Sequence, residues 1–352
     1  MNSRLHLQGA RIQGVLRWET GLALVVVIIG IVGASVSSSF FTSTNFFNLG
    51  LTNGEIAIMT LPMTLIVISG EIDLSVASTL GMSSALLGYL WARHWPMIAI
   101  FVLIALVGLA AGAFNGLLVT RFGLPSLAVT IGTLALYRGI ATILLGPNTV
   151  ASFPAAYTNL GVNAVPFTGN DITYSTAIFV VLAIVFGVIL HATPFGRSVY
   201  AMGASPEAAQ FAGIRVKRIK TILFMNSGLI CALAGVLWTF RLNTAVQNNG
   251  LGLELDVVAI VLLGGVSIFG GKGSVTGVVL AVLAFAGIQN ALFLTNFNQE
   301  AAGIVTGALL LLSVFGRNLA TFSARLRALL PASRRGGGAG GAAADPAAVT
   351  PP

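Results

Sequence analysis

The stretch that decides the fold is MIAIFVLIALVGLAAGAFNGLLVT, which occupies Met97–Thr120 and contains no charged side chain. A helix needs about 20 predominantly apolar residues to cross about 30 Å of bilayer hydrocarbon. A helix that is apolar on every side lies either in a large core or in a membrane. This run therefore predicts a transmembrane helix.

The rest of the chain has the same character. Of its 352 residues, 56% are hydrophobic and only 8% are charged, whereas a soluble domain carries about 25% charged residues. We therefore predict an all-α polytopic membrane protein with about ten transmembrane helices, since apolar runs of this kind recur along the chain. The runs are Gly21–Ser37, Gly50–Gly70, Leu74–Trp91, Met97–Thr120, Leu127–Leu145, Tyr174–His191, Ile222–Phe240, Val257–Phe269, Val275–Leu294 and Ala301–Phe315.

The first run has two interpretations. It follows a tail with Arg4, Arg11 and Arg17, as the apolar core of a secretory signal would. No small-residue cleavage site leads from it into a soluble domain, and further apolar runs follow at once. We therefore expect an uncleaved first helix after an N-terminal tail at residues 1–18.

The basic residues predict the orientation, because Lys and Arg collect in cytoplasmic loops. With ten crossings and a cytoplasmic N-terminus, only Arg93 and Arg241 lie outside and Arg138 lies within a helix. The reversed orientation would place nearly all of them on the wrong side. We expect a transmembrane domain over residues 19–320 with both termini in the cytoplasm. Residues 321–352, rich in Gly, Ala and Pro, predict a mostly disordered cytoplasmic tail.

The composition also excludes some functions. The net charge of +8 is spread between apolar runs, without the clustered basic patch that a nucleic-acid surface needs. Cys231 is the single cysteine, and His6, His94 and His191 are far apart. No disulfide and no metal site is expected from this pattern.

Two of the apolar runs are interrupted. Pro62 lies inside the run Ile56–Ser69, and Gly264–Gly265 lies inside the run Val257–Phe269. Interrupted pairs of this kind mark broken helices along a transport path. The alternative is a pair of tilted helices that pack through small residues. On the outer side, the loop Gly146–Thr173 predicts a short ordered cap or half-helix, because prolines and aromatic residues alternate in it.

The most informative polar stretch is Thr193–Lys220, the longest inner loop. Ser205 is a good N-cap, Pro206 suits the first helical position, and Glu207 complements the positive end of a helix. Gly213 supplies a left-handed C-terminal stop. We predict a two-turn helix over Pro206–Ala212. Because such a helix is too short to be stable alone, we expect it to dock on a partner, with Phe211 available for contact.

Here the sequence resembles a known family. Glu207-Ala208-Ala209, followed after three residues by Gly213, resembles the EAA-x-x-x-G coupling loop of ATP-binding-cassette importer permeases. The hydrophobic-Leu-Pro ending of many such loops is absent, which points to the monosaccharide branch. SGEIDLSVAS (69–78), AGAFNGLLVTRFGLPSLAVTIGTLALYRGIA (111–141) and LLGGVSIFGGKGSVTG (262–277) resemble the ribose/xylose/arabinose/rhamnose-type permeases, autoinducer-2 permeases included.

The resemblance covers Phe46–Phe315 and implies a pore subunit in the bacterial inner membrane. It implies cytoplasmic ATPase subunits that bind ATP and Mg²⁺, a second permease subunit, an extracytoplasmic sugar-binding protein and surrounding lipid as partners, with no nucleic acid and no cofactor in this chain. Tyr137–Pro154 and Leu255–Gly273 look closest to rhamnose and autoinducer-2 members. The residues expected to couple to the ATPase are Ser205, Pro206, Glu207, Ala208, Ala209, Phe211 and Gly213.

Polar groups inside a membrane are expensive and are functional candidates. Glu71 and Asp73 lie at an inner helix junction, where they could form a gate or a coupling contact; Asp73 is better explained as a helix cap. Glu71 stands where many family members have Gly. Arg138, beside Tyr137, is expected to be a structural anchor that needs a carboxylate or carbonyl partner. Glu55, Asn115, Asn226, Gln289 and Asn290 could line the path or join helices to one another.

An enzyme is not expected. Gly271-Lys272 fails the phosphate-loop pattern, because position 266 is Val and position 273 is Gly. No nucleophile with a nearby base is evident, so an intramembrane enzyme is the weakest reading. The main alternative is a stand-alone sugar–cation symporter, which would need a carboxylate near the middle of the bilayer. The acids lie near the ends of the apolar runs, which argues against it.

Overall fold

The apolar runs form helices, because a backbone surrounded by hydrocarbon satisfies its polar groups only within a helix or a closed barrel. The computed structural model describes residues 2–166, 168, 171–295, 303–309 and 311. The elements are α1 (Asn2–Val36), α2 (Ser43–Ile68), α3 (Val76–Trp91), α4 (Met97–Arg121), α5 (Ser126–Leu145), β1 (Val150–Ala151), α6 (Ala155–Val162), α7 (Tyr174–Ala192), α8 (Pro194–Ala204), α9 (Pro206–Phe211), α10 (Val216–Leu242), β2 (Thr244–Ala245), α11 (Leu253–Leu263) and α12 (Val275–Leu294).

The structure confirms an all-α membrane protein with several spans. Within the described residues, seven helices are long and apolar enough to cross a bilayer, namely α1, α2, α4, α5, α7, α10 and α12. Helix α3 has 16 residues and α11 has 11, which is short for a crossing. Residues 303–309 are helical, but most of the run 301–315 and the whole tail 321–352 lie outside the described part. A total of ten crossings stays a prediction.

Several helices have other bounds than the apolar runs. Helix α1 begins at Asn2, so the N-terminal tail is helical and continuous with the first span. Helix α2 begins at Ser43 and runs through Pro62 without a break. Helix α11 ends at Leu263, where Gly264–Gly265 do interrupt the run, so the expected crossing to Phe269 is not helical there. The run at Gly264–Gly265 is therefore interrupted, as the first of the two interpretations expects, whereas the run at Pro62 is not.

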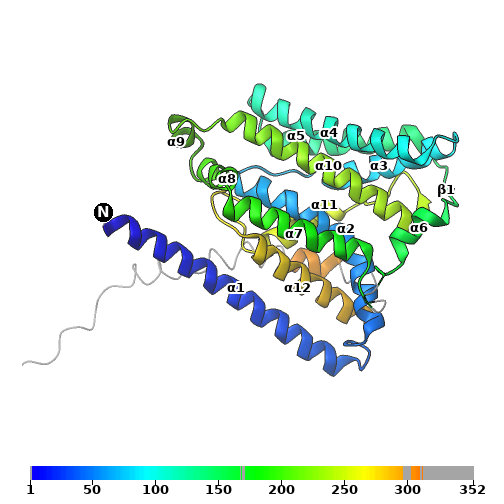
Figure 1. The fold of residues 1–352 in the computed structure, drawn as a ribbon, viewed down its shortest axis with the longest axis horizontal. Coiled ribbons are helices and arrows are strands. Elements are labelled where there is room, and N and C mark those ends of the chain that lie inside the picture. Colours follow the sequence, from blue (N-terminus) through cyan, green and yellow to red (C-terminus); the bar gives the residue numbers. More distant parts are fainter. Residues whose placement is uncertain (1, 167, 169–170, 296–302, 310, 312–352) are drawn as a thin grey trace, which may run out of the picture. The chain divides into compact units, whose positions relative to one another are not determined.

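Helices α2 and α10 form the centre of the bundle. Helix α10 packs against α4, α3 and α2, while α2 also packs against α7, α11 and α12. Every residue from Asn53 to Ile68 on α2 is buried. Figure 1 shows these long helices running side by side, with α1 next to α12. Helices α2 and α10 are therefore surrounded by the other helices of the bundle.

Small residues allow α4 and α10 to approach closely. Gly108, Gly112 and Gly116 repeat at four-residue spacing along α4 and meet the backbone of α10. A Cβ atom at Gly112 would lie 2.1 Å from the carbonyl oxygen of Phe224, and one at Gly228 would lie 2.2 Å from that of Gly108. This is the small-residue packing that joins helices in a membrane.

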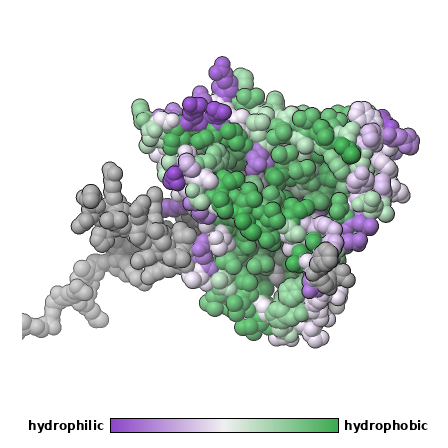
Figure 2. Space-filling model, viewed as in Figure 1, coloured by the Kyte–Doolittle hydropathy of each residue, from purple (hydrophilic) through white to green (hydrophobic). Residues whose placement is uncertain are grey.

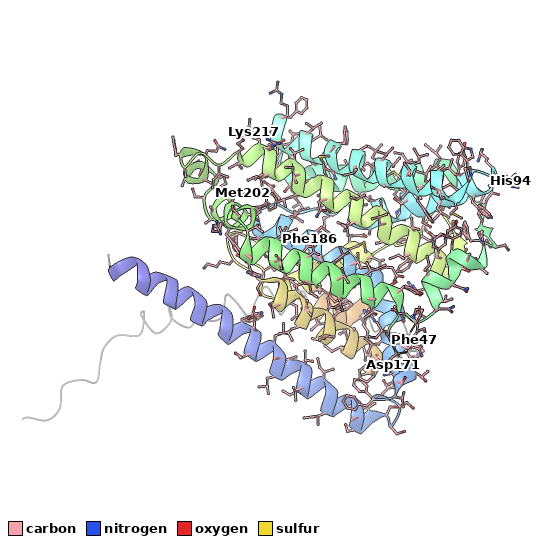
Figure 3. All side chains as sticks on the ribbon, in the orientation of Figure 1. Phe47, His94, Asp171, Phe186, Met202 and Lys217 are labelled. Atoms are coloured by element: carbon pink, nitrogen blue, oxygen red, sulfur yellow. The ribbon has the colours of Figure 1, made fainter. Side chains whose placement is uncertain are left out.

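The two ends of the bundle differ. At one end α6, the predicted half-helix of the outer loop, packs against the end of α10, and β1 pairs antiparallel with β2. At the other end lie α8 and α9 (Figure 1). Figure 3 likewise places His94 at one end and Met202 with Lys217 at the other. In the face shown in Figure 2, hydrophobic residues cover the middle and hydrophilic residues gather toward the ends, as a membrane-spanning body requires.

We predict that Gly112→Ala destabilises the protein. The added methyl group would meet backbone atoms of α10, so the two helices must separate, at a cost of about 1–3 kcal/mol. Gly187→Ala on α7 is the matched control, because a Cβ atom there meets nothing within 4 Å. Thermal unfolding of the purified chain in detergent micelles should show a lower midpoint for Gly112→Ala only. Equal midpoints would contradict the close packing of α4 on α10.

The orientation can be tested with single cysteines. Asn159 on α6 and Gln210 on α9 are both exposed, and Cys231 is buried and can be replaced by Ala. An impermeant thiol reagent added outside intact cells should label Asn159→Cys at once. It should label Gln210→Cys only after the inner membrane is opened. The reverse order of labelling would overturn the cytoplasmic assignment of α8 and α9.

Candidate functional site

The predicted short helix of the inner loop exists, and its caps are those expected. Helix α9 begins at Pro206, and the Ser205 side-chain oxygen accepts a hydrogen bond of 3.2 Å from the backbone N–H of Ala208. After the helix, Gly213 has a φ of +82°. Its N–H donates to the Gln210 carbonyl, and the Ile214 N–H donates to the Ala209 carbonyl. These two bonds form a Schellman motif, which needs a residue without strain at positive φ.

The outer surface of α9 offers both a charge and an aromatic ring. Glu207 and Ala208 are exposed, and the Phe211 side chain is 94% exposed. Ala209, one of the residues expected to couple to the ATPase, is 3% exposed and packs against the protein itself; its part in the coupling contact stays a prediction. A ring as exposed as that of Phe211 fits a contact with another subunit.

Helix α8 was not predicted, and it connects α9 to the membrane helices. Gly203 on α8 lies against the end of α2, where a Cβ atom would be 1.8 Å from the Ile68 carbonyl oxygen. The same carbonyl accepts a hydrogen bond of 2.8 Å from the Gly271 N–H. The inner loop is therefore mostly helical, and α8 packs against both α2 and the loop that follows α11.

A tyrosine fixes α8 to the same loop. The Tyr200 hydroxyl donates a 2.7 Å hydrogen bond to the carbonyl of Gly273. Burial, and then the nearby Glu19 carboxylate, raises the pKa of Tyr200 to about 12. The phenol therefore stays protonated and remains a donor at neutral pH.

Gly271 and Lys272 thus lie in a loop that packs against α8 and the end of α2. Gly270 and Gly271 both have positive φ and lie against Gly203 and Ala204 of α8. A phosphate loop would instead precede a helix at the end of a strand and present its amides to the ligand.

Glu71 and Asp73 are close in sequence but have different surroundings. Glu71 is half-buried and forms an ion pair with Lys220, which lies near the start of α10. Asp73 is fully enclosed, with 2% of its surface exposed. One of its oxygens accepts from the backbone N–H of Ser75 at 3.0 Å and from its hydroxyl at 2.6 Å. Asp73 therefore does cap the turn before α3, as expected.

The other oxygen of Asp73 makes a contact that the sequence did not suggest. It accepts a 2.9 Å hydrogen bond from the hydroxyl of Ser227. Ser227 lies close to the middle of α10, a helix of 27 residues, or about 40 Å at 1.5 Å per residue. Asp73 thus lies at the junction of α2 and α3, as expected, but this junction lies beside the middle of the spanning helix α10.

Asn115 and Tyr137 extend this polar cluster. The Asn115 amide donates to the Ser75 hydroxyl at 2.8 Å, and the Tyr137 hydroxyl donates to the Ala111 carbonyl at 2.8 Å. Tyr137 also lies 3.4 Å from the side-chain oxygen of Asn115. These hydrogen bonds join α3, α4, α5 and α10. Because the cluster is closed to solvent, it does not line an open path in this structure.

Glu55 belongs to a second polar cluster. Its carboxylate is fully buried, accepts from Arg241 at 3.2 Å and from the Ser175 hydroxyl at 3.3 Å, and has a second oxygen without a hydrogen-bond partner among the described residues. Arg241 lies in the last turn of α10, and Ser175 in the first turn of α7. Glu55 is therefore inside α2 but level with the outer ends of its two neighbours.

Arg138 anchors the backbone that leads into α11. It donates to the carbonyl oxygens of Asn249 at 2.7 Å and Gln247 at 3.3 Å. These are the carbonyl partners that its position required. The contacts support the prediction of a structural anchor.

The remaining candidates are separate from these clusters. Asn290 on α12 exchanges two amide hydrogen bonds with Asn45 on α2, at 2.9 and 2.8 Å. Asn226 and Gln289 are half-buried. The structure therefore does not bring the seven candidate path residues into one site. No group of three metal-ligating side chains occurs among the described residues.

Sequence reasoning missed four partners, namely Asn45, Ser175, Ser227 and Arg241. Each is a polar residue in or beside an apolar run, which is the signal that could have found it. The pairing itself joins residues far apart, such as Asp73 with Ser227 and Glu55 with Arg241.

Apolar helices packed around buried polar clusters, with a capped helix exposed at one end, define a multi-pass membrane transport protein. The chain belongs to the family described as branched-chain amino acid transport system / permease component, whose model matches residues 45–314. The match covers nearly the same residues as the expected resemblance. It confirms a permease component of the bacterial inner membrane and not an enzyme.

Relatives with assigned roles are similar over almost their whole length. The Autoinducer 2 import system permease protein LsrD of Klebsiella pneumoniae subsp. pneumoniae is 30% identical over 329 residues, covering 89% of this chain and 95% of that protein. The Ribose import permease protein RbsC of Bacillus subtilis is 33% identical over 313 residues, covering 88% and 94%. No solved structure shows a significant match.

We predict that Arg241→Gln is strongly destabilising, because it leaves Glu55 charged, buried and unpaired. Removing one partner of a buried ion pair costs about 3–5 kcal/mol. The double variant Glu55→Gln/Arg241→Gln should recover much of this loss, because no buried charge is left alone. Arg93→Gln, which removes an exposed arginine over the Tyr89 ring, is the control. A double variant less stable than Arg241→Gln in thermal unfolding would refute the pairing.

Proposed function

We propose that this chain is the membrane-spanning subunit of an ATP-driven importer that carries a monosaccharide into the cytoplasm. The observation that carries the proposal is α9, a capped two-turn helix with Glu207 and Phe211 exposed on the surface. A helix this short is not stable alone, and the exposed ring of Phe211 would be covered by a docked partner. The EAA-x-x-x-G pattern within it identifies that partner as an ATPase subunit.

Movement of α9 would reach the membrane helices by two routes. Helix α8 contacts the end of α2 at Gly203 and the loop after α11 through Tyr200. The second route is α10, which follows α9 directly and pairs with Glu71 through Lys220. ATP-driven closure of the partner subunits would displace α9 and switch the pore between outward- and inward-facing states.

The substrate class follows from the relatives. Their names assign autoinducer 2 and ribose to permeases that align with nearly all of this chain. We propose a small sugar, either rhamnose-like or a related pentose, hexose or autoinducer-2-type molecule.

Three partners complete the importer in this proposal. Cytoplasmic ATPase subunits would bind ATP and Mg²⁺ and contact α9. A second permease subunit, identical or similar, would complete the pore, and an outer sugar-binding protein would deliver the substrate. The chain would need no cofactor of its own.

The position of Asp73 leaves one alternative function to be tested, a sugar–cation symporter. A buried carboxylate near the middle of α10 is what a sugar–cation symporter would use. Its two oxygens already accept three hydrogen bonds, and Ser75 beside it starts α3. This arrangement favours a helix cap over an ion-binding group.

We expect Gly213→Val and Glu207→Lys to uncouple ATP hydrolysis from uptake while the chain stays inserted. Valine strains the positive φ at Gly213, and lysine reverses the charge at the docking surface. Loss of a docking contact of about 2 kcal/mol would lower coupled uptake roughly 30-fold. Membrane abundance, ATPase co-purification and sugar uptake in proteoliposomes are the measurements.

Gly252→Val is the matched control, because Gly252 also has positive φ and open surroundings but lies just before α11 and not in the loop that carries α9. It should keep its coupling. Normal uptake in both α9 variants would contradict the coupling assignment. Uptake that collapses when an uncoupler is added at constant ATP would support the symporter in place of the importer.

A further inference from the structure

A cavity of about 450 Å³ lies beside α9, where the turn between α4 and α5 meets the start of α10. Its walls come from the α2–α3 junction, the α4–α5 turn, α9 and α10. The lining residues are Glu71, Val119, Thr120, Arg121, Phe122, Gly123, Leu124, Pro125, Pro206, Gln210, Val216, Lys217 and Lys220.

The cavity has an excess of positive charge. Lys220 is paired with Glu71, which leaves Arg121 and Lys217 as the other charged groups of the lining. Both side chains are exposed, and among the described residues neither forms an ion pair. The cavity therefore presents two free cations beside a neutralised pair.

An apolar strip leaves the cavity along α5. Phe122 is 69% exposed and Leu124 is 45% exposed at the rim. Leu127 and Ile131 continue the strip one helical turn apart, at 46% and 51% exposure. Exposed apolar residues on a spanning helix face lipid chains, so this cavity opens toward the bilayer as well as toward water.

We propose that this cavity binds the phosphate headgroup of an anionic lipid from the inner leaflet, with an acyl chain along Leu124, Leu127 and Ile131. Arg121 and Lys217 would hold the phosphate. Basic pockets at the cytoplasmic ends of membrane helices suit such headgroups. A free phosphate would use the cations but gain nothing from the apolar strip, so the lipid is the better match.

The site would also connect the bilayer to the coupling helix. Pro206 and Gln210 of α9 form one wall, and the α4–α5 turn forms another. A bound headgroup would therefore hold α9 against the membrane body. This consequence rests on the proposed coupling function, whereas the binding itself rests only on the cavity and its charge.

The test is native mass spectrometry of the purified full-length chain in neutral detergent, titrated with dioleoyl phosphatidylglycerol. Arg121→Gln/Lys217→Gln should bind it roughly 25-fold more weakly, since each basic residue near an anionic surface contributes about fivefold. The matched control Arg215→Gln/Arg218→Gln removes the same charge from exposed neighbours outside the cavity and should bind within about twofold of the parent.

Two further titrations identify which part of the lipid is bound. Dioleoyl phosphatidylcholine and soluble glycerol 3-phosphate should both bind much more weakly than phosphatidylglycerol. Equal binding of either, or equal losses in the two double variants, would overturn the proposal. Arg121→Lys/Lys217→Arg keeps the charge and should keep the binding, which separates a lost site from a misfolded chain. Because no ATPase is present, failure here leaves the α9 coupling test untouched.

Discussion

Three carboxylates, on α2 and on the segment after it, each contact a donor on α10. These contacts hold together the two helices at the centre of the bundle, around which the other helices pack. Glu55 pairs with Arg241, Asp73 with Ser227, and Glu71 with Lys220. The contacts lie near the C-terminal end, the middle and the N-terminal end of α10. Because hydrocarbon supplies no water to replace a lost partner, the two buried contacts, those of Glu55 and Asp73, strongly disfavour separation of α2 and the segment after it from α10.

This arrangement explains why the polar residues of the chain do not form one open path. Asp73 and Asn115 both hydrogen-bond to Ser75, and the Tyr137 hydroxyl donates to the Ala111 carbonyl. Arg138 does the same with carbonyls before α11. In a membrane such contacts join helices, and here they surround a core that α4 and α10 close through glycine contacts. In the proposed importer, a path for sugar then has to run beside this core, or between this chain and a second permease subunit.

Much of the fold could be predicted from local signals. The apolar runs identified most spans, and Ser205, Pro206 and Gly213 identified α9, because caps act within one turn of the chain. Helix α8 was missed although Thr193-Pro194 carries a similar N-cap signal, since its glycines and polar residues obscured the helix. The partners of Asp73 and Glu55 could not be found, because they are 154 and 186 residues away. Only packing decides which polar residue of another helix they meet.

The same contacts constrain how a signal from α9 can travel. If α2 and α10 are joined at three depths, they respond to a push at the inner end as one body. Helix α8 contacts that body at Ile68 and also contacts the glycine loop after α11. That loop has several residues at positive φ and follows a helix of only 11 residues. We therefore expect relative motion to be easiest between the joined pair and the α11 segment, where the contacts are backbone hydrogen bonds to a loop and not side-chain contacts of carboxylates. Helix α8, which leads into α9, contacts both sides of this junction.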